Sequence, residues 1–292
     1  MTARAWAALL LALLLPVEAV AAERFAHGIL WRVSRDGVAP SYVFGTIHVA
    51  DPRVLDLPEA VGRALGRSRR LYVETRLGAR EEARFFEAEQ FDDGRRLEPL
   101  IGAEAYAGVA AELRRRNVPD DVIARIKPWA ALVNLTVQPD DYASATLDQK
   151  IVAIARAHGA RVLGLEGIEE QIAVFERIPL ETQIALLKHA LAHRDELAAM
   201  IEPTIQAWMR RDLAGVHAAS ERVGQRYPEM AEHYRILYRS VVENRTVVMA
   251  HRLFMPLREG RAFVAVGANH LYGRRGLLAL IEEQGYRVTR VY

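Results

Sequence analysis

The sequence contains no cysteine. Disulfide frameworks, thiolate zinc sites, iron–sulfur clusters and cysteine nucleophiles are therefore excluded, and any metal ion must be held by His and carboxylate side chains. An excess of one charge is also lacking, because 39 Lys and Arg residues against 37 Asp and Glu residues leave a formal net charge of +2. Proteins that neutralise nucleic-acid phosphates carry a larger positive excess, so nucleic acid is not an expected partner.

Linkers and repeats are missing as well. No Pro/Gly/Ser-rich stretch divides the chain, and no internal repeat recurs at a period of about 20–50 residues, which excludes solenoids and propellers. Apolar residues make up 51% of the 292 residues, which is enough for a packed core. We expect residues 23–292 to form a single domain.

The first 22 residues have the pattern of a signal peptide. Arg4 precedes an apolar stretch from Trp6 to Leu15, and Ala19-Val20-Ala21-Ala22 provides a small-residue cleavage site. A membrane anchor is the alternative, but the apolar stretch is short and is followed by Pro16 and Glu18. We therefore expect cleavage near Ala22, no stable membrane anchor afterwards, and a periplasmic or secreted protein.

Short apolar runs alternate with long helical patterns, which predicts an α/β fold: a mixed central sheet of about six strands with flanking helices and a large helical insertion. The predicted strands are Gly28–Val33, Tyr42–Gly45, Arg70–Val73, Arg161–Leu165, Ala262–Val266 and Arg287–Val291.

Three helices are also predicted. Asp56 is expected to cap a helix that runs to about Arg67. A second helix is expected from Thr146 to His158, ended by Gly159 in a left-handed conformation. A long helix is expected from Pro228 to about Phe254, with Tyr234, Leu237, Val241 and Val248 on one face.

Four predicted strands lead into residues that can bind a metal ion or move a proton. These residues are His48, Glu74, Glu166 and His270. In open α/β sheets ligands bind beyond the carboxyl ends of the strands, so the four side chains are expected at one place. Glu74 and Glu166 follow their strands directly, where a charge needs a partner, a metal ion or a shifted pKa.

The two histidines share a Gly-x-x-His motif, with Gly45 before His48 and Gly267 before His270. Glycine after a strand permits a positive φ or a close backbone approach, and a side chain three residues later can then point back over the strand end. For each histidine the alternative is an ordinary polar residue of a loop or core. For each glutamate it is a salt bridge to an Arg or, for Glu166, a helix cap.

These residues, together with further motifs, resemble the TraB/GumN family, which is grouped with the Tiki metalloproteases and the erythromycin-esterase-like hydrolases. The similarity runs from about His27 to Val291. It rests on Phe44–His48 with Asp51-Pro52, Tyr72–Glu74, Leu147–Gln149, Gly164–Glu166 with Glu170-Gln171, Asn244-Arg245 and Val266–Leu271. Family members commonly have Gly before the second His, where this chain has Asn269.

The resemblance implies an active centre built from His48, Glu74, Arg245 and His270. In the mechanism that we derive from it, His48, Glu74 and His270 bind one divalent metal ion of the Zn, Mn or Co type and leave a position open for water. Glu166 is then expected to be the general base, and Arg245 to stabilise the oxyanion of a peptide or of a small ester or amide substrate.

The remaining positions have supporting roles in this mechanism. Asn244 would orient the substrate or Arg245, and Gly45, Gly267 and Asn269 would contact the substrate. Asp148 and Gln149 are expected to cap and brace the helix that follows them. His189 and His193, four residues apart, are expected on a solvated helix face.

Two other functions stay open. The chain resembles metal-free esterases, in which His48 would activate water as a base. Haem-binding relatives of the wider superfamily leave room for a non-catalytic protein that binds haem or a peptide. The sequence does not give the oligomeric state.

Overall fold

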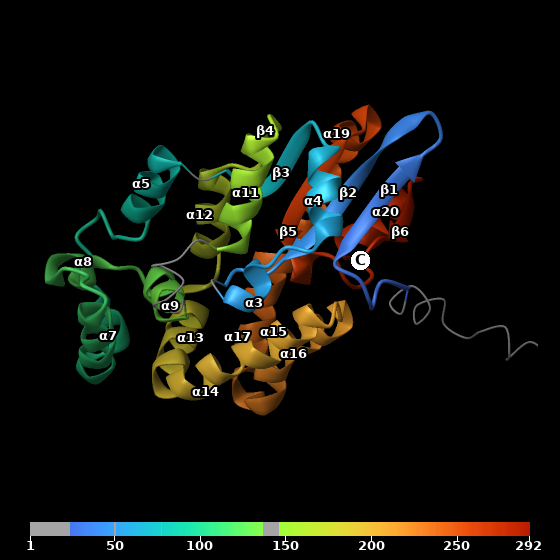
Figure 1. Ribbon diagram of the computed structural model, residues 1–292. Coiled ribbons are helices and arrows are strands. Elements are labelled where there is room, and N and C mark those ends of the chain that lie inside the picture. Colours follow the sequence, from blue (N-terminus) through green and yellow to red (C-terminus); the bar gives the residue numbers. More distant parts are fainter. Residues whose placement is uncertain (1–23, 50, 77, 137–145) are drawn as a thin grey trace, which may run out of the picture.

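The computed structural model describes residues 24–49, 51–76, 78–136 and 146–292 (Figure 1). The predicted signal peptide lies outside these residues and stays a prediction. No helix among the described residues is long and apolar enough to cross a membrane.

The centre of the fold is a six-stranded sheet with the order β4-β3-β5-β2-β1-β6. All six predicted strands are confirmed, with ends that differ by a few residues. Their bounds are β1 Leu30–Arg35, β2 Val38–Thr46, β3 Arg70–Thr75, β4 Arg161–Glu166, β5 Ala262–Gly267 and β6 Arg287–Arg290.

The sheet is mixed. Strands β4, β3, β5 and β2 run parallel, whereas β1 is antiparallel to both β2 and β6. Because β5 enters the sheet between β3 and β2, the carboxyl ends of three adjacent strands meet at one edge, with β4 beside them. The predicted convergence of the four strand ends is therefore confirmed at the level of the sheet.

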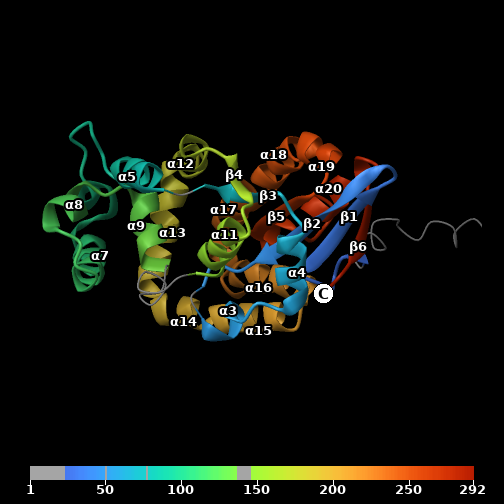
Figure 2. The same ribbon diagram turned by 45° about the horizontal axis from the view of Figure 1, so that its top comes forward.

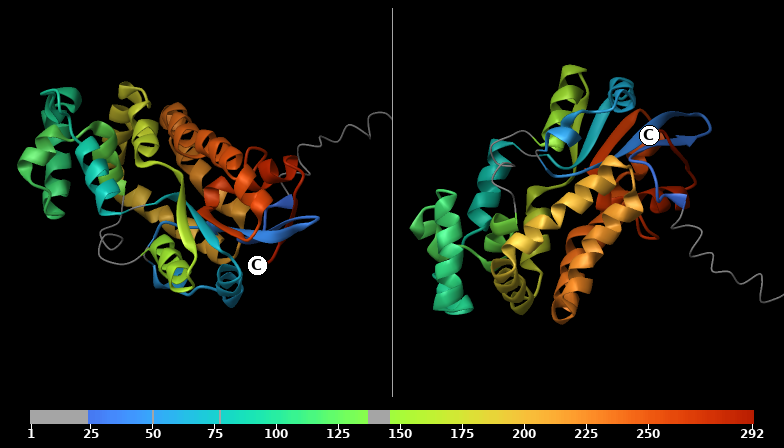
Figure 3. Two further views of the ribbon diagram at one scale, coloured as in Figure 1. Left: turned by 90° about the horizontal axis from the view of Figure 1, so that it is seen from above. Right: turned by 60° about the horizontal axis from the view of Figure 1, so that its bottom comes forward.

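Helices cover both faces of the sheet, which explains why its central strand β5 is apolar throughout. Every residue of β5 is buried, and Phe44 and Phe263 pack against each other in the core. Viewed from above, α4 and α11 lie on one face of the sheet, and α18, α19 and α20 lie on the other (Figure 3). Their bounds are α4 Glu59–Gly66, α11 Leu147–Ala157, α18 Asn244–Arg252, α19 Phe254–Glu259 and α20 Leu277–Glu283.

The predicted helical insertion is present as a lobe beside the sheet (Figure 2). It has its own apolar core, which includes Leu97, Leu113 and the stacked rings of Trp129 and Phe175. Its helices are α5 Ala79–Ala88, α6 Leu97–Ile101, α7 Ala103–Arg115, α8 Asp120–Arg125, α9 Pro128–Thr136, α12 Ile168–Glu176 and α13 Leu180–Ala192.

Further helical segments connect the lobe to the carboxyl ends of the strands. Helix α15 packs on α16 and on the short helix α3, and α16 contacts η3. Their bounds are α3 Pro52–Leu55, α14 Arg194–Ala199, α15 Ile201–Met209, α16 Leu213–Arg226, η1 Pro228–Met230, α17 Ala231–Tyr238, the π-helical turn η2 Arg239–Glu243, and η3 Ala268–His270.

The structure shows which residues cap the first two of the predicted helices. Helix α11 begins with a capping box of Thr146 and Gln149, and Gly159 has φ +75°, as expected for a left-handed stop. The predicted cap at Asp56 is wrong, because Pro58 precedes α4 and Asp56 instead ends α3.

The long helix predicted from Pro228 to Phe254 is interrupted. The π-helical turn η2 lies between α17 and α18 and shifts the helical register by inserting an extra residue. The predicted apolar face is therefore lost. Val248 is exposed, while Thr246, Met249 and Ala250 are the buried side chains of α18.

Candidate functional site

Three side chains from adjacent strands converge at the carboxyl edge of the sheet. His48 follows β2, Glu74 is in β3, and His270 lies in η3 directly after β5. The Nε2 atom of His48 is 3.5 Å from Oε1 of Glu74, and the Nε2 atom of His270 is 3.7 Å from the same oxygen. The structure thus brings together both Gly-x-x-His histidines and one of the two predicted carboxylates.

The two glycines of the motifs provide space, and neither has a positive φ. A Cβ atom on Gly45 would lie 2.8 Å from Leu271 Cδ1 and 3.2 Å from the Cα atom of Ala268. A Cβ atom on Gly267 would lie 3.2 Å from His48 Nε2 and 3.3 Å from Glu74 Oε1. Each glycine therefore makes room for residues outside its own motif, and Gly267 leaves open the space between the converging groups.

Each imidazole is held through its Nδ1 atom. His48 Nδ1 is 2.8 Å from Oδ2 of Asp148, whose Oδ1 atom accepts a hydrogen bond from Thr46. His270 Nδ1 is 2.7 Å from Oγ1 of Thr246. Thr246 donates its own hydrogen to the Val242 carbonyl oxygen, so Nδ1 of His270 must be the donor. The unprotonated Nε2 atom of His270 then faces Glu74.

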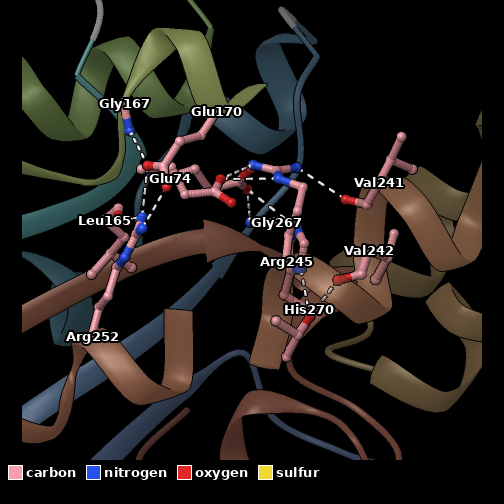
Figure 4. Close-up of polar contacts among 12 residues, drawn as sticks. Glu74, Leu165, Gly167, Glu170, Val241, Val242, Arg245, Arg252, Gly267 and His270 are labelled. Carbon is pink, nitrogen blue, oxygen red and sulfur yellow. Dashed lines mark hydrogen bonds and ion pairs between the residues drawn. The ribbon is translucent and has the colours of Figure 1, made fainter. Parts of the chain in front are cut away.

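Arg245 lies beside Glu74 (Figure 4). It also binds Glu166 and so joins the two glutamates. Its Nη2 atom is 2.6 Å from Oε2 of each glutamate, and its Nη1 atom donates to the Val241 carbonyl oxygen. The exposed fraction of the side chain is 12% for Arg245, 13% for Glu74 and 4% for Glu166. This is a buried ion triad, so the alternative stated for both glutamates, a salt bridge to an Arg, is present in the structure.

The local charges set the protonation of the cluster. Burial lowers the pKa of His270 to about 4, so this imidazole is neutral at neutral pH. Burial also pulls the pKa of Glu74 upward, but the side chains around the carboxylate outweigh burial and hold that pKa well below its usual range. Because His270 is uncharged at neutral pH, we attribute the ionisation of the Glu74 carboxyl at that pH to Arg245 and His48. The Asp148 carboxylate, helped by Glu74, holds the pKa of His48 well above its usual value.

The donor atoms of the cluster are those of a divalent-metal site, two imidazole nitrogens and a carboxylate oxygen. Among the described residues no group of three or more His, Asp or Glu side chains is arranged so that it could hold a metal ion. However, ligands bonded to a tetrahedral ion at ~2.1 Å lie about 3.4 Å apart, close to the separations of 3.5 and 3.7 Å seen here. The lone pair of His270 Nε2 faces a carboxylate oxygen, so a cation between them would relieve the repulsion.

The family model described as the TraB/PrgY/gumN family matches residues 29–290. The chain belongs to this family. The resemblance stated from the motifs is therefore confirmed, and the mixed α/β fold agrees with it.

A curated relative of this TraB/PrgY/gumN chain is the protein named Metalloprotease TIKI2 from Danio rerio. The two sequences are 24% identical over 91% of this chain, and the chain spans 61% of the length of that relative. No solved structure matches the chain significantly.

Glu166 and Asn244 do not lie beside the imidazoles. The described contacts of the Glu166 carboxylate are with Arg245, which separates it from the two histidines. Glu166 and Asn244 line a different cleft of about 410 Å³ between α12 and α18. No hydrogen bond joins Asn244 to Arg245 in the described part of the chain, so the orienting role expected of Asn244 finds no support there.

Three other residues were predicted to contact the substrate: Gly45, Gly267 and Asn269. Gly45 and Gly267 are buried. The Asn269 side chain accepts a hydrogen bond from Ser220, at 3.2 Å. Ser220 and His48 both line a cleft of about 1010 Å³ between the sheet and the helical lobe, and the His48 side chain is 61% exposed there. This cleft gives solvent access to His48.

Sequence reasoning missed the role of Thr246 and assigned Asp148 and His189 to the wrong places. Asp148 was expected to cap α11, but Thr146 is the cap and Asp148 binds His48. Thr246 gave no signal beyond its place next to Arg245. His189 was expected in solvent with His193, yet it is buried and bonded to Tyr234, because the rings of Tyr227 and Tyr234 pack against it.

Proposed function

We propose that this protein is a metal-dependent hydrolase that cleaves an amide or ester bond beyond the carboxyl ends of β2, β3 and β5. The observation that carries the proposal is the convergence of His48, His270 and Glu74 on the space left by Gly267. Two imidazoles and one carboxylate are a ligand set for an ion of the Zn, Mn or Co type. Similarity to a protein named a metalloprotease supports the same reaction class.

The chain's own residues would orient this centre. Asp148 and Thr246 fix the two imidazoles, which is the usual arrangement around metal-ligating histidines. The Gly267 N–H donates to Glu74 Oε1 at 2.8 Å and fixes the carboxylate. When bound, a divalent ion there supplies a Lewis acid and lowers the pKa of water towards ~7.

Arg245 and Glu166 have linked roles in the proposal. Arg245 has five N–H groups, and its described contacts use four of them, so one is available to an oxyanion. Because Glu166 is bonded to Arg245, we assign to Glu166 the positioning of Arg245 in place of the expected role as general base.

The metal-free esterase is a second candidate, favoured by the His48–Asp148 pair. An Asp that accepts from Nδ1 of a histidine orients that histidine as a general base in hydrolases. The Asp148 carboxylate raises the pKa of His48, so the unprotonated imidazole that a general base needs forms only as the pH rises. This mechanism therefore requires activity that increases as the pH rises through the pKa of His48.

Hydrolysis assays separate the two candidates. We expect the protein to cleave fluorogenic amide or ester reporters, to lose activity in EDTA, and to regain it with Zn²⁺, Mn²⁺ or Co²⁺. His48→Ala and His270→Ala should each lower kcat/KM at least 100-fold, while the exposed His158→Ala control keeps wild-type activity. Full activity in EDTA with loss only in His48→Ala would favour the esterase, and turnover by both variants would refute the site.

Three further proposals, on signal-peptide cleavage, haem binding and peptide binding, have tests of their own. N-terminal sequencing of the secreted or periplasmic protein checks cleavage near Ala22. Visible absorbance after haem addition tests the haem-binding alternative, and turnover of a reporter separates a hydrolase from a protein that only binds a peptide.

A further inference from the structure

The cleft that reaches His48 has a second end with different chemistry. Its volume of about 1010 Å³ is at the upper end of the ~300–1,000 Å³ typical of small-molecule pockets. From His48 the cleft extends to α7 and α14, where Arg115 and Arg194 line it. A ligand that fills it would be extended, with one part near the imidazoles and another near these two arginines.

The wall between the two ends is largely apolar. Aliphatic side chains from β2's following loop and from α9, α14, α15 and α16 face the cleft. They are Val49, Leu135, Leu197, Met200, Ile201 and Val223. Contact with such a surface favours a ligand with apolar side chains over most of its length.

The far end carries charged side chains of both signs. Arg115 and Arg194 both pair with the same oxygen of Glu112, whose side chain is 14% exposed. Asp195 also pairs with Arg194, at 3.3 Å, but its side chain is 92% exposed, so this pair is weak. Two guanidinium groups thus share one largely buried carboxylate. The side chain of Arg115 is 63% exposed and that of Arg194 is 39% exposed.

We propose that Arg115 and Arg194 bind a carboxylate of the substrate. The inference rests on the proposed function and deepens it: the substrate is a peptide with apolar residues in the middle of the cleft and an anionic group several residues from the bond that is cleaved. Guanidinium groups bind carboxylates through paired N–H donors, which gives orientation as well as affinity. The carboxylate comes from an acidic side chain or from a free C-terminus.

Binding without turnover tests the proposal on metal-free protein in EDTA. The probes are N-acetylated hexapeptides of Leu, Val and Ala with a last residue of amidated Glu, amidated Gln or free-acid Gln, and the measurement is isothermal titration calorimetry. We expect at least one of the two anionic peptides to bind about 10-fold more tightly than amidated Gln, the equivalent of ~1.4 kcal/mol. Preference for amidated Glu identifies a side chain, and preference for free-acid Gln identifies a C-terminus.

Two variants are expected to change the preference for the anionic peptide in opposite directions. Arg194→Gln should remove the preference for the anionic peptide, whereas Glu112→Gln removes a competing carboxylate and should strengthen it. Arg114→Gln is the matched control, because Arg114 neighbours Arg115 on α7 but pairs with Asp120 and does not line the cleft. The expected result is unchanged binding by this control.

Two results would overturn the proposal: equal affinity of wild-type protein for all three peptides, or an Arg194→Gln variant that behaves like Arg114→Gln. The failure of the proposed function is distinguishable from these. A metal-loaded protein that prefers the anionic peptide but never cleaves it refutes the hydrolase and supports the carboxylate site.

Discussion

Replacing Gly267 by Ala is expected to abolish hydrolysis and metal binding while the protein stays folded. The new Cβ atom would lie 3.2 Å from His48 Nε2 and 3.3 Å from Glu74 Oε1, and it would occupy the space on which these groups converge. The backbone itself accepts Ala, since Gly267 has φ −52° and ψ 138°. We expect kcat/KM to fall at least ~100-fold, because outer-shell changes alone cost up to that much.

The matched control is Gly62→Ala in α4, where a Cβ atom meets nothing within 4 Å. Ala in a helix interior stabilises by roughly 0.5–1 kcal/mol relative to Gly, so this variant should be active and slightly more stable. The extra methyl at Gly267 should cost no more than about 1–3 kcal/mol of the free energy of unfolding. Urea unfolding and metal titration of both variants provide the measurement. A fully active Gly267→Ala variant would contradict the proposed centre.

Replacing Arg245 by Met is expected to cause the largest loss of stability. Arg245 is the counter-ion of two glutamates whose side chains are 13% and 4% exposed. Removing one partner of a buried ion pair leaves an uncompensated charge and typically costs about 3–5 kcal/mol. We expect a loss of this size in the free energy of unfolding at pH 7, measured by urea denaturation.

A double variant tests the cause of that loss. Burial raises the pKa of Glu166, and Arg245 only partly offsets it, so Glu166 is the more easily neutralised of the two. Arg245→Met with Glu166→Gln should therefore be more stable than Arg245→Met alone, although activity stays lost because Glu74 still lacks its partner. If adding Glu166→Gln lowers the stability further, the ion-triad account is wrong.

The sequence predicted the sheet and its converging strand ends because each strand carries its own local signal. The apolar runs of β5 and β2 are visible without any tertiary contact, and each ends at a Gly-x-x-His motif. Parallel strand order then placed His48, Glu74 and His270 at adjacent strand ends, although they come from distant parts of the chain.

Contacts between distant elements could not be predicted in the same way. Asp148 at the start of α11 has the local appearance of a capping residue, and only the packing of α11 on the sheet brings it to His48. The π-helical turn before Asn244 has no sequence pattern that marks it, yet it sets the direction in which Arg245 and Thr246 point. The pairing of Glu166 with Arg245 likewise depends on α18 lying against β4.

The central claim is that His48, Glu74 and His270 hold one divalent ion. Elemental analysis of the mature protein, purified without a His-tag and dialysed against Zn²⁺, Mn²⁺ or Co²⁺, tests it most directly. We expect about one ion per chain in the wild type and none in His48→Ala or His270→Ala, with His158→Ala unchanged. An empty wild type, or equal metal content in all four proteins, would contradict it.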